Sequence, residues 1–330
     1  MTGELPAGQT STWSRVWKLF WNEQEGRLRA FCRVLLQLVT AAIITIVLEI
    51  GFSVLLPEKT MFSVFSKQNL ISLGFVGSVW LAARFLDHRP FTDFGLRFNK
   101  SWWVDAGFGL VLGALMEVSQ FLVQWANGWI TVTDTFYTTD SHLPFAVILV
   151  FSLVTFLGVG ISEELVSRGY QLRNMAEGLN FPFVGPRVAL LLALLLSSSV
   201  FGLLHLVMHS NADAGLLDNV LSILPQTLDG FMLGIAYLLT GQLAVPIGIH
   251  TAVNFFGTSI FGSGESETHF PSFFTVEPTE AGQKVFAPIL PNVLFEGLLW
   301  VPVVLLIVLW VSRRHGRIVL HTFLSYPSQR

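Results

Sequence analysis

The sequence predicts an all-α polytopic membrane protein, a bundle of about eight transmembrane helices with a polar cavity inside the membrane. Three observations support this class, and two of them concern composition. Hydrophobic residues make up 52% of the 330 residues, charged residues make up 12%, and the mean hydropathy is +0.61. Soluble domains usually carry about 25% charged residues. The chain is therefore too apolar and too poorly charged for a soluble domain.

The third observation is a series of apolar runs, each long enough to cross about 30 Å of hydrocarbon as a helix. Two of the runs contain small residues one helical turn apart, which allows helix backbones to approach closely. These pairs are Gly109 with Gly113 and Gly230 with Gly234. The eight runs cover residues 34–56, 69–86, 104–123, 145–162, 188–208, 218–239, 243–262 and 289–312.

The distribution of basic residues predicts the orientation, because Lys and Arg gather in the cytoplasmic loops of membrane proteins. With the N-terminus inside, sixteen of the nineteen Lys and Arg residues fall in cytoplasmic segments. Both termini are therefore expected in the cytoplasm. The run at 34–56 begins too far from Met1, and follows too many basic residues, to be a cleaved signal. All eight spans are expected to be retained.

The chain divides into one membrane domain and two terminal segments. Residues 1–33 are expected to form a cytoplasmic amphipathic segment, in which "WSRVWKLFW" spaces its aromatic residues as an interfacial helix does. Residues 34–312 form a single transmembrane domain, and residues 313–330 form a basic cytoplasmic tail. The longest polar stretch is an outer loop at about 263–288. The single cysteine, Cys32, excludes intrachain disulfides and thiolate metal clusters.

The stretch "GISEELVSRGY" places two adjacent acids, Glu163 and Glu164, directly after an apolar run. Each carboxylate in hydrocarbon costs roughly 2.5 to 3.5 kcal/mol on insertion scales, so both need a reason to be there. Arg168 lies on the same helix face as Glu164, and an ion pair between them would keep Glu164 ionised. Glu163 points about 100° away and fits a general base. A salt-bridged helix end at the inner membrane surface explains Glu164 and Arg168, but not Glu163.

Two later spans carry a histidine one helical turn from a second notable residue. In "VFGLLHLVMH" the pair is Phe201 and His205, and in "VPIGIHTAVNFF" it is His250 and Asn254. A single membrane histidine more often makes a hydrogen bond between helices than it catalyses a reaction. Ionisable groups in membranes usually face the bundle interior or a wet cavity, so three such polar faces together indicate a functional site.

The ordered motifs EExxxR, FxxxH and HxxxN resemble those of the CPBP family, the CAAX-protease and bacteriocin-processing membrane proteases. Within this family the chain is most similar to the type II CAAX prenyl endopeptidase-like group. The resemblance covers about residues 100–262. It implies an eight-helix bundle with a conical cavity open toward the cytosol. The motif residues are Glu163, Glu164, Arg168, Phe201, His205, His250 and Asn254.

The resemblance implies an intramembrane endopeptidase that hydrolyses peptide bonds of membrane-associated or prenylated substrates. Glu163 with His205 would activate water, while His250 and Asn254 would stabilise the oxyanion. The implied partners are a membrane-associated peptide or protein and the lipid bilayer, with no nucleic acid, and the expected location is a prokaryotic cell membrane. The remaining motif residues, Glu164, Arg168 and Phe201, would support this arrangement.

The sequence is compatible with two mechanisms, one with a metal cofactor and one without. The family is often labelled metalloprotease, and the side chains that would hold a divalent metal such as zinc are Glu163, His205 and His250. No HExxH helix is present, so a metal-free glutamate mechanism with no cofactor is preferred. Both mechanisms meet one difficulty. At 1.5 Å per residue along straight helices, Glu163 and His205 would lie roughly 15 Å apart in depth, so a tilted or bent helix is required.

Two other functions fit parts of the pattern. A non-catalytic membrane scaffold or bacteriocin-immunity protein would use the same fold without the chemistry. A transporter or proton relay would also use Glu, His and Asp side chains, although inverted repeats and paired broken helices are not evident. Asp229 is expected to line the cavity or to pair with a polar neighbour. The membrane acids left out of the site are Glu49, Glu117, Asp229 and Glu296.

Overall fold

The computed structural model describes most of the chain. The described residues are 12–55, 60–138, 143–209, 215–263, 270–286 and 288–327. The predicted terminal segments 1–33 and 313–330, and the predicted loop 263–288, therefore lie partly outside the described residues.

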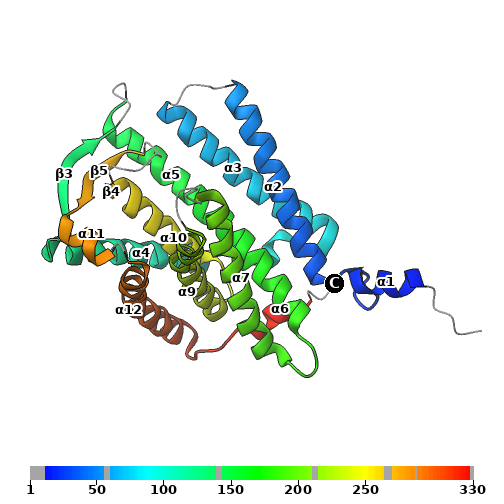
Figure 1. Ribbon diagram of the computed structural model, residues 1–330. Coiled ribbons are helices and arrows are strands. Elements are labelled where there is room, and N and C mark those ends of the chain that lie inside the picture. The colour runs from blue at the N-terminus through cyan, green and yellow to red at the C-terminus, as the bar shows by residue number, and fades with distance from the viewer. Residues whose placement is uncertain are drawn as a thin grey trace, which may run out of the picture.

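The described chain folds mainly into helices that pack side by side (Figure 1). Seven of the described helices are long and apolar enough to cross a membrane, and each overlaps one predicted span. The prediction of an all-α polytopic membrane protein is confirmed, and the chain is a multi-pass membrane protein. The seven helices are Ala30–Leu55, Met61–Asp87, Lys100–Ala126, Phe145–Leu179, Gly185–Leu206, Asn219–Thr240 and Ile289–Arg314.

The helical elements follow the apolar runs of the sequence, interrupted by short π-helical and 3-10 segments. The α-helices are α1 (Thr12–Phe20), α2 (Ala30–Leu55), α3 (Met61–Ala82), α4 (Lys100–Ala126), α5 (Phe145–Glu164), α6 (Arg173–Leu179), α7 (Gly185–His209), α8 (Leu216–Leu221), α9 (Leu224–Thr240), α10 (Ala244–Phe255), α11 (Glu280–Phe286) and α12 (Ile289–His315). The π-helical segments are η1 (Ala83–Asp87), η3 (Leu165–Leu172) and η4 (Phe256–Ile260), and the 3-10 segments are η2 (Phe91–Phe94) and η5 (Thr322–Ser325).

The predicted span at 243–262 is helical over almost its whole length. Helix α10 has 12 residues and η4 adds 5, which is at the short end of the roughly 17 to 25 residues of a spanning helix. Residues 244–252 are all buried, and α10 packs against α4, α5 and α9. A helix enclosed by other helices is as apolar as one that faces lipid, so hydropathy located this helix but did not show that other helices surround it.

Helix α5, segment η3 and helix α6 form one continuous helix from Phe145 to Leu179. Its 35 residues correspond to about 50 Å, more than the roughly 30 Å of hydrocarbon. The end at α6 therefore extends beyond the apolar layer. All eight residues of η3 are buried, so this wider turn lies inside the bundle immediately after the two adjacent acids.

A small β-sheet at one end of the bundle was not predicted. Strands β3 (Ile130–Tyr137) and β5 (Ser272–Pro278) pair antiparallel, and β4 (Phe261–Ser263) pairs parallel with β5. The expectation of a polar loop was therefore wrong for β5 and for α11. A short antiparallel hairpin connects α1 to α2. Its strands, β1 (Trp21–Asn22) and β2 (Arg27–Leu28), have two residues each.

Helix α1 confirms the helix predicted from "WSRVWKLFW". Trp17, Leu19 and Phe20 are exposed on it, and Trp17 stacks on Trp21 with ring centroids 5.7 Å apart. Figure 1 shows α1 lying beside the end of the bundle rather than within it. The interfacial position of α1 remains a prediction, since it concerns lipid.

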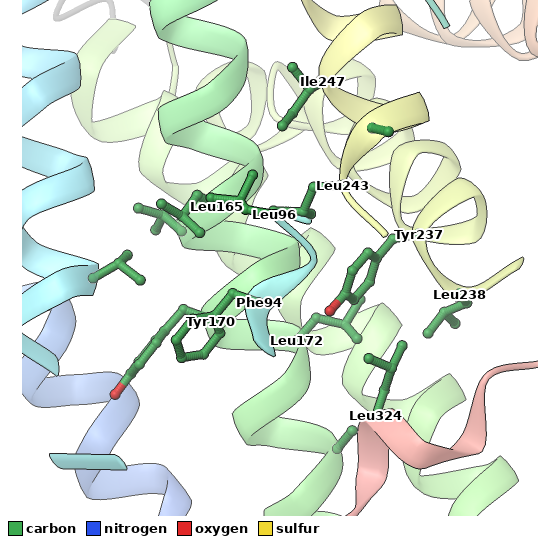
Figure 2. Close-up of a cluster of buried hydrophobic side chains, with 14 of the residues drawn as sticks. Phe94, Leu96, Leu165, Tyr170, Leu172, Tyr237, Leu238, Leu243, Ile247 and Leu324 are labelled. Atoms are coloured by element: carbon green, nitrogen blue, oxygen red, sulfur yellow. The ribbon is translucent and has the colours of Figure 1, made fainter. Parts of the chain in front are cut away.

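Opposite the β-sheet, the bundle is closed by a buried cluster that joins distant parts of the chain. Figure 2 shows Phe94 of η2, Tyr170 of η3, Tyr237 of α9 and Leu324 of η5 within it. Leu324 is 1% exposed, and Asn180 donates a hydrogen bond to the carbonyl of Ser325 (3.0 Å). The segment after α12 is thus bound to the bundle, next to α6 (Figure 1).

A buried ion network fastens α2, η1 and α6 at this same end. Arg27 and Arg33 both contact Asp87, the former at 3.1 Å, and Arg89 contacts Glu177 at 2.6 Å. Burial alone would lower the pKa of Arg89, but the charge of Glu177 and a hydrogen bond to it raise that pKa above its ordinary value. Arg89 therefore remains charged while buried.

Candidate active site

The two adjacent acids have different surroundings. Helix α5 ends at Glu164, and η3 begins at the next residue. The side chain of Glu164 is 0% exposed, whereas that of Glu163 is 24% exposed. Only Glu163 can therefore meet water or a substrate directly.

Glu164 is fixed by the ion pair predicted from its spacing to Arg168. Arg168 Nη1 donates to Glu164 Oε1 at 2.9 Å, and Nη2 donates to the carbonyl of Gly230 at 3.0 Å. The guanidinium also lies 4.5 Å from the ring centroid of Phe201, within cation–π range. Arg168 thus connects η3 to α7 and α9.

His250 is the second partner of Glu164. Its Nδ1 lies 2.7 Å from Glu164 Oε1, and its Nε2 lies 3.7 Å from Glu163 Oε2. An ionised carboxylate only accepts hydrogen bonds, so Nδ1 carries the proton in this contact. Nε2 then faces Glu163 at a distance slightly longer than a direct hydrogen bond.

Small residues bring α10 to this position. A Cβ atom at Gly160 would lie 3.2 Å from the backbone nitrogen of Thr251, and a Cβ atom at Gly113 would lie 2.6 Å from the carbonyl oxygen of Ile249. Only glycine permits backbones to approach this closely. Since Gly160 precedes Glu163 by one turn and Thr251 follows His250, the contact sets acid and imidazole side by side. The close approach predicted at Gly113 is confirmed.

His205 and Phe201 form a second histidine face on α7. Their ring centroids are 4.6 Å apart, and His205 Nδ1 lies 2.9 Å from the Phe201 carbonyl oxygen. Because a carbonyl only accepts, Nδ1 is the donor there, which leaves Nε2 as an acceptor in the neutral ring. The ring of Phe201 also lies 6.3 Å from that of His250. Phe201 is thus a ring neighbour of both histidines.

Asn254 lies one turn after His250 on α10, on the same helix face, and is half-buried. Helix α10 ends at the next residue, Phe255, and η4 follows directly. The amide is therefore placed at the last α-helical turn, on the side of His250 nearer the β-sheet.

The predicted metal ligands do not fit an ion in this arrangement. Within the described part of the chain, no three His, Cys, Asp or Glu side chains converge closely enough to hold a metal. Glu163 and His250 are neighbours, but the ring of His205 packs on Phe201. Three protein ligands are usual for a catalytic zinc.

Three acids left out of the predicted site lie close to it. Asp229 directly precedes Gly230, the acceptor of Arg168, and Trp300 Nε1 donates to Asp229 Oδ1 at 2.7 Å. Glu296 of α12 also lies within interaction range of Asp229. Glu117 lies against Gly257. The polar pairing expected for Asp229 is confirmed. In the sequence, these three acids could be noticed only because each lies within an apolar run.

Comparison with known proteins supports the family indicated by the motifs. Residues 145–256 match the family model described as "Type II CAAX prenyl endopeptidase Rce1-like", and this segment contains all seven motif residues. The predicted resemblance is confirmed over this segment, which is shorter than the expected 100–262. The chain is also 24% identical over 244 residues to "Uncharacterized protein YyaK" of Bacillus subtilis (strain 168), covering 70% of this chain and 73% of that protein. No solved structure matches.

Proposed function

We propose that the chain is an intramembrane endopeptidase that cleaves a peptide bond of a membrane-associated or prenylated substrate with water activated by Glu163. One observation carries the proposal. Glu164 is buried and bonded to both Arg168 and His250, whereas Glu163 is partly exposed and faces His250. Glu164 thus holds the helices together, and Glu163 is accessible for catalysis. The match to the Rce1-like family model supports the same reaction class.

In the proposed reaction Glu163 is first a general base and then a general acid. It takes a proton from water as the water oxygen attacks the peptide carbonyl carbon. When the carbon–nitrogen bond breaks, Glu163 returns this proton to the leaving amine, so its own charge is restored. His205 would orient the water through Nε2, since its Nδ1 is directed at the Phe201 carbonyl.

The developing oxyanion needs donors that are already in place. His250 is held by its Nδ1 contact with Glu164, and Nε2, when it carries a proton, points toward the space beside Glu163. Asn254 supplies an amide from the next turn of α10. Both groups lie on a helix fixed by glycine contacts, so little reorganisation is required during the reaction.

The proposal includes no metal ion, because the side chains of Glu163, His205 and His250 do not converge as ligands. It places both termini in the cytoplasm, which the distribution of Lys and Arg supports. It also places the protein in a prokaryotic cell membrane, which the bacterial relative supports.

The experiment compares two glutamate variants of the purified full-length protein in liposomes. Glu163→Gln removes the proposed base, and Glu49→Gln is the matched control. Glu49 lies on α2, has a 47% exposed side chain and pairs with Lys67 at 2.9 Å. Turnover is measured on membrane-anchored peptides with and without a prenyl group. Loss of a general base lowers turnover by about 100-fold to 10,000-fold, and Glu49→Gln should be unchanged.

Each result has a distinct meaning. Equal turnover by Glu163→Gln and wild type would show that Glu163 is not the base. Wild-type protein without turnover on any of the peptides would favour the scaffold or immunity function. Activity that is lost on chelation and restored by zinc would contradict the metal-free mechanism.

A further inference from the structure

A pocket lies at the end of the bundle that carries the buried ion network, and it is separate from the candidate active site. Its volume is about 450 Å³. It lies between the loop after η2, the start of α6, the turn from α9 to α10 and the segment around η5. Its lining residues are Asp93, Gly95, Arg97, Arg173, Gly241, Phe323, Tyr326 and Pro327.

The inner walls of this pocket are fixed by hydrogen bonds between distant segments. The carbonyl of Gly95 accepts from the backbone of Leu243 (3.1 Å) and from Trp102 Nε1 (3.0 Å). Gly95 has a φ of +95°, and a Cβ there would lie 2.9 Å from the nitrogen of Leu243. Near the lining residue Gly241, the backbone of His321 donates to the carbonyl of Leu238 (3.1 Å). Hydrogen bonds therefore fix the backbone on two sides of this open pocket.

The charge of the pocket favours an anion. Its lining contains two guanidinium groups, one from Arg173, which is 5% exposed, and one from Arg97, which is exposed. Asp93 is the one carboxylate among the described residues of the lining. Behind Arg173, three further arginines surround three carboxylates. This network consists of Arg27, Arg33 and Arg89 with Glu25, Asp87 and Glu177.

Arg173 already belongs to this network, since its Nε lies 3.6 Å from Glu177 Oε1 and its Nη1 donates to the carbonyl of Asp93. An anion that enters the pocket would meet the exposed guanidinium of Arg97 first. The planar guanidinium fork matches the oxygens of a phosphate group, and Arg97 extends from the accessible side.

The remaining lining is largely apolar and lies near the start of a membrane-crossing helix. Phe323 and Tyr326 are 43% and 49% exposed, and Pro327 is beside them. The membrane-crossing helix α4 begins at Lys100, three residues after Arg97. Cationic and aromatic side chains together at this level are typical of a site that meets lipid headgroups.

We propose that this pocket binds the phosphate ester of an anionic phospholipid from the adjacent leaflet. Arg97 and Arg173 hold the phosphate, and Phe323 and Tyr326 pack against the glycerol and the first acyl carbons. The inference does not depend on the peptidase proposal, because none of the pocket residues belongs to the candidate active site.

The test is native mass spectrometry of the full-length protein released from detergent micelles that contain phosphatidylglycerol or phosphatidylcholine. Wild type should retain phosphatidylglycerol in clear preference to phosphatidylcholine. Arg97→Gln should lower that retention about tenfold, the effect of losing one charge-assisted hydrogen bond. Arg317→Gln is the control, because Arg317 is an exposed arginine that does not line the pocket. Thermal unfolding of each variant shows that the fold is retained.

Two further arms complete the test. Tyr326→Ala should weaken phosphatidylglycerol retention while leaving the charge unchanged. Glycerol 3-phosphate is added as a soluble competitor. Displacement of the lipid by millimolar glycerol 3-phosphate would support a phosphate site that a soluble ester also fills, and resistance to it would support the lipid. Equal retention by Arg97→Gln and Arg317→Gln, or no preference for phosphatidylglycerol in wild type, would overturn the proposal.

Discussion

The contact between α4 and α10 at Gly113 allows a direct test of how the candidate site is held. A methyl group added at Gly113 would lie 2.6 Å from the carbonyl oxygen of Ile249 and 2.8 Å from Cβ of Ala252. Ordinary van der Waals contact begins at 3.4 Å. The substitution Gly113→Ala therefore requires the two helices to separate by about 0.8 Å.

The cost of this separation has two opposing parts. Overpacking a well-packed interior typically costs about 1 to 3 kcal/mol, while alanine is favoured over glycine in a helix by up to about 1 kcal/mol. A net destabilisation of about 1 to 2 kcal/mol is expected. The effect on turnover should be larger, because His250 directly follows Ile249 and moves with it relative to Glu163. A displacement near 1 Å can lower a rate by about 100-fold.

Gly107→Ala is the matched control on the same helix. Gly107 is exposed, and a Cβ atom added there has no neighbour within 4 Å. This variant should be as stable as wild type or up to about 1 kcal/mol more stable. Both variants are unfolded in mixed detergent micelles, and both are assayed for turnover. If the two variants unfold alike and turn over alike, the α4–α10 contact does not fix the position of α10.

Two other substitutions test the packing around the site. Arg168→Met leaves the buried carboxylate of Glu164 without its ion-pair partner, so unfolding should become easier by about 3 to 5 kcal/mol; adding Glu164→Gln should recover much of this loss, and a further loss would contradict the pairing. Leu324→Ala opens a cavity in the cluster that binds η5, which should cost about 2 to 5 kcal/mol. The exposed Ile318→Ala should be neutral in the same unfolding titration, and equal effects of both changes would contradict the burial of η5.

The membrane-crossing helices could be predicted because their signal is local in the sequence. Each lipid-facing helix needs a run of apolar residues, and such a run can be recognised without knowing its neighbours. The same reasoning located α10 but did not show that its apolar residues face other helices. It failed for β5, because a strand of seven residues with partners distant in the sequence leaves a weak local pattern.

The contacts of the candidate site also divide into those that the sequence predicts and those that it does not. Contacts within one helix follow from spacing, so the pair of Glu164 and Arg168 could be predicted from the sequence alone. Contacts between helices depend on crossing angles and on which backbones approach closely. The bond from His250 to Glu164 therefore could not be predicted, although Gly113 indicated that a close approach existed.

The contact between helices also changes how the acid pair is understood. From spacing alone, Glu164 has one partner and supports the helix end, which any surface ion pair could do. In the structure the same carboxylate oxygen receives both a guanidinium and an imidazole, at 2.9 Å and 2.7 Å. An ordinary salt-bridged helix end does not require that imidazole. Because the imidazole then turns its other nitrogen toward Glu163, the arrangement gives the second acid a reason to be in the membrane.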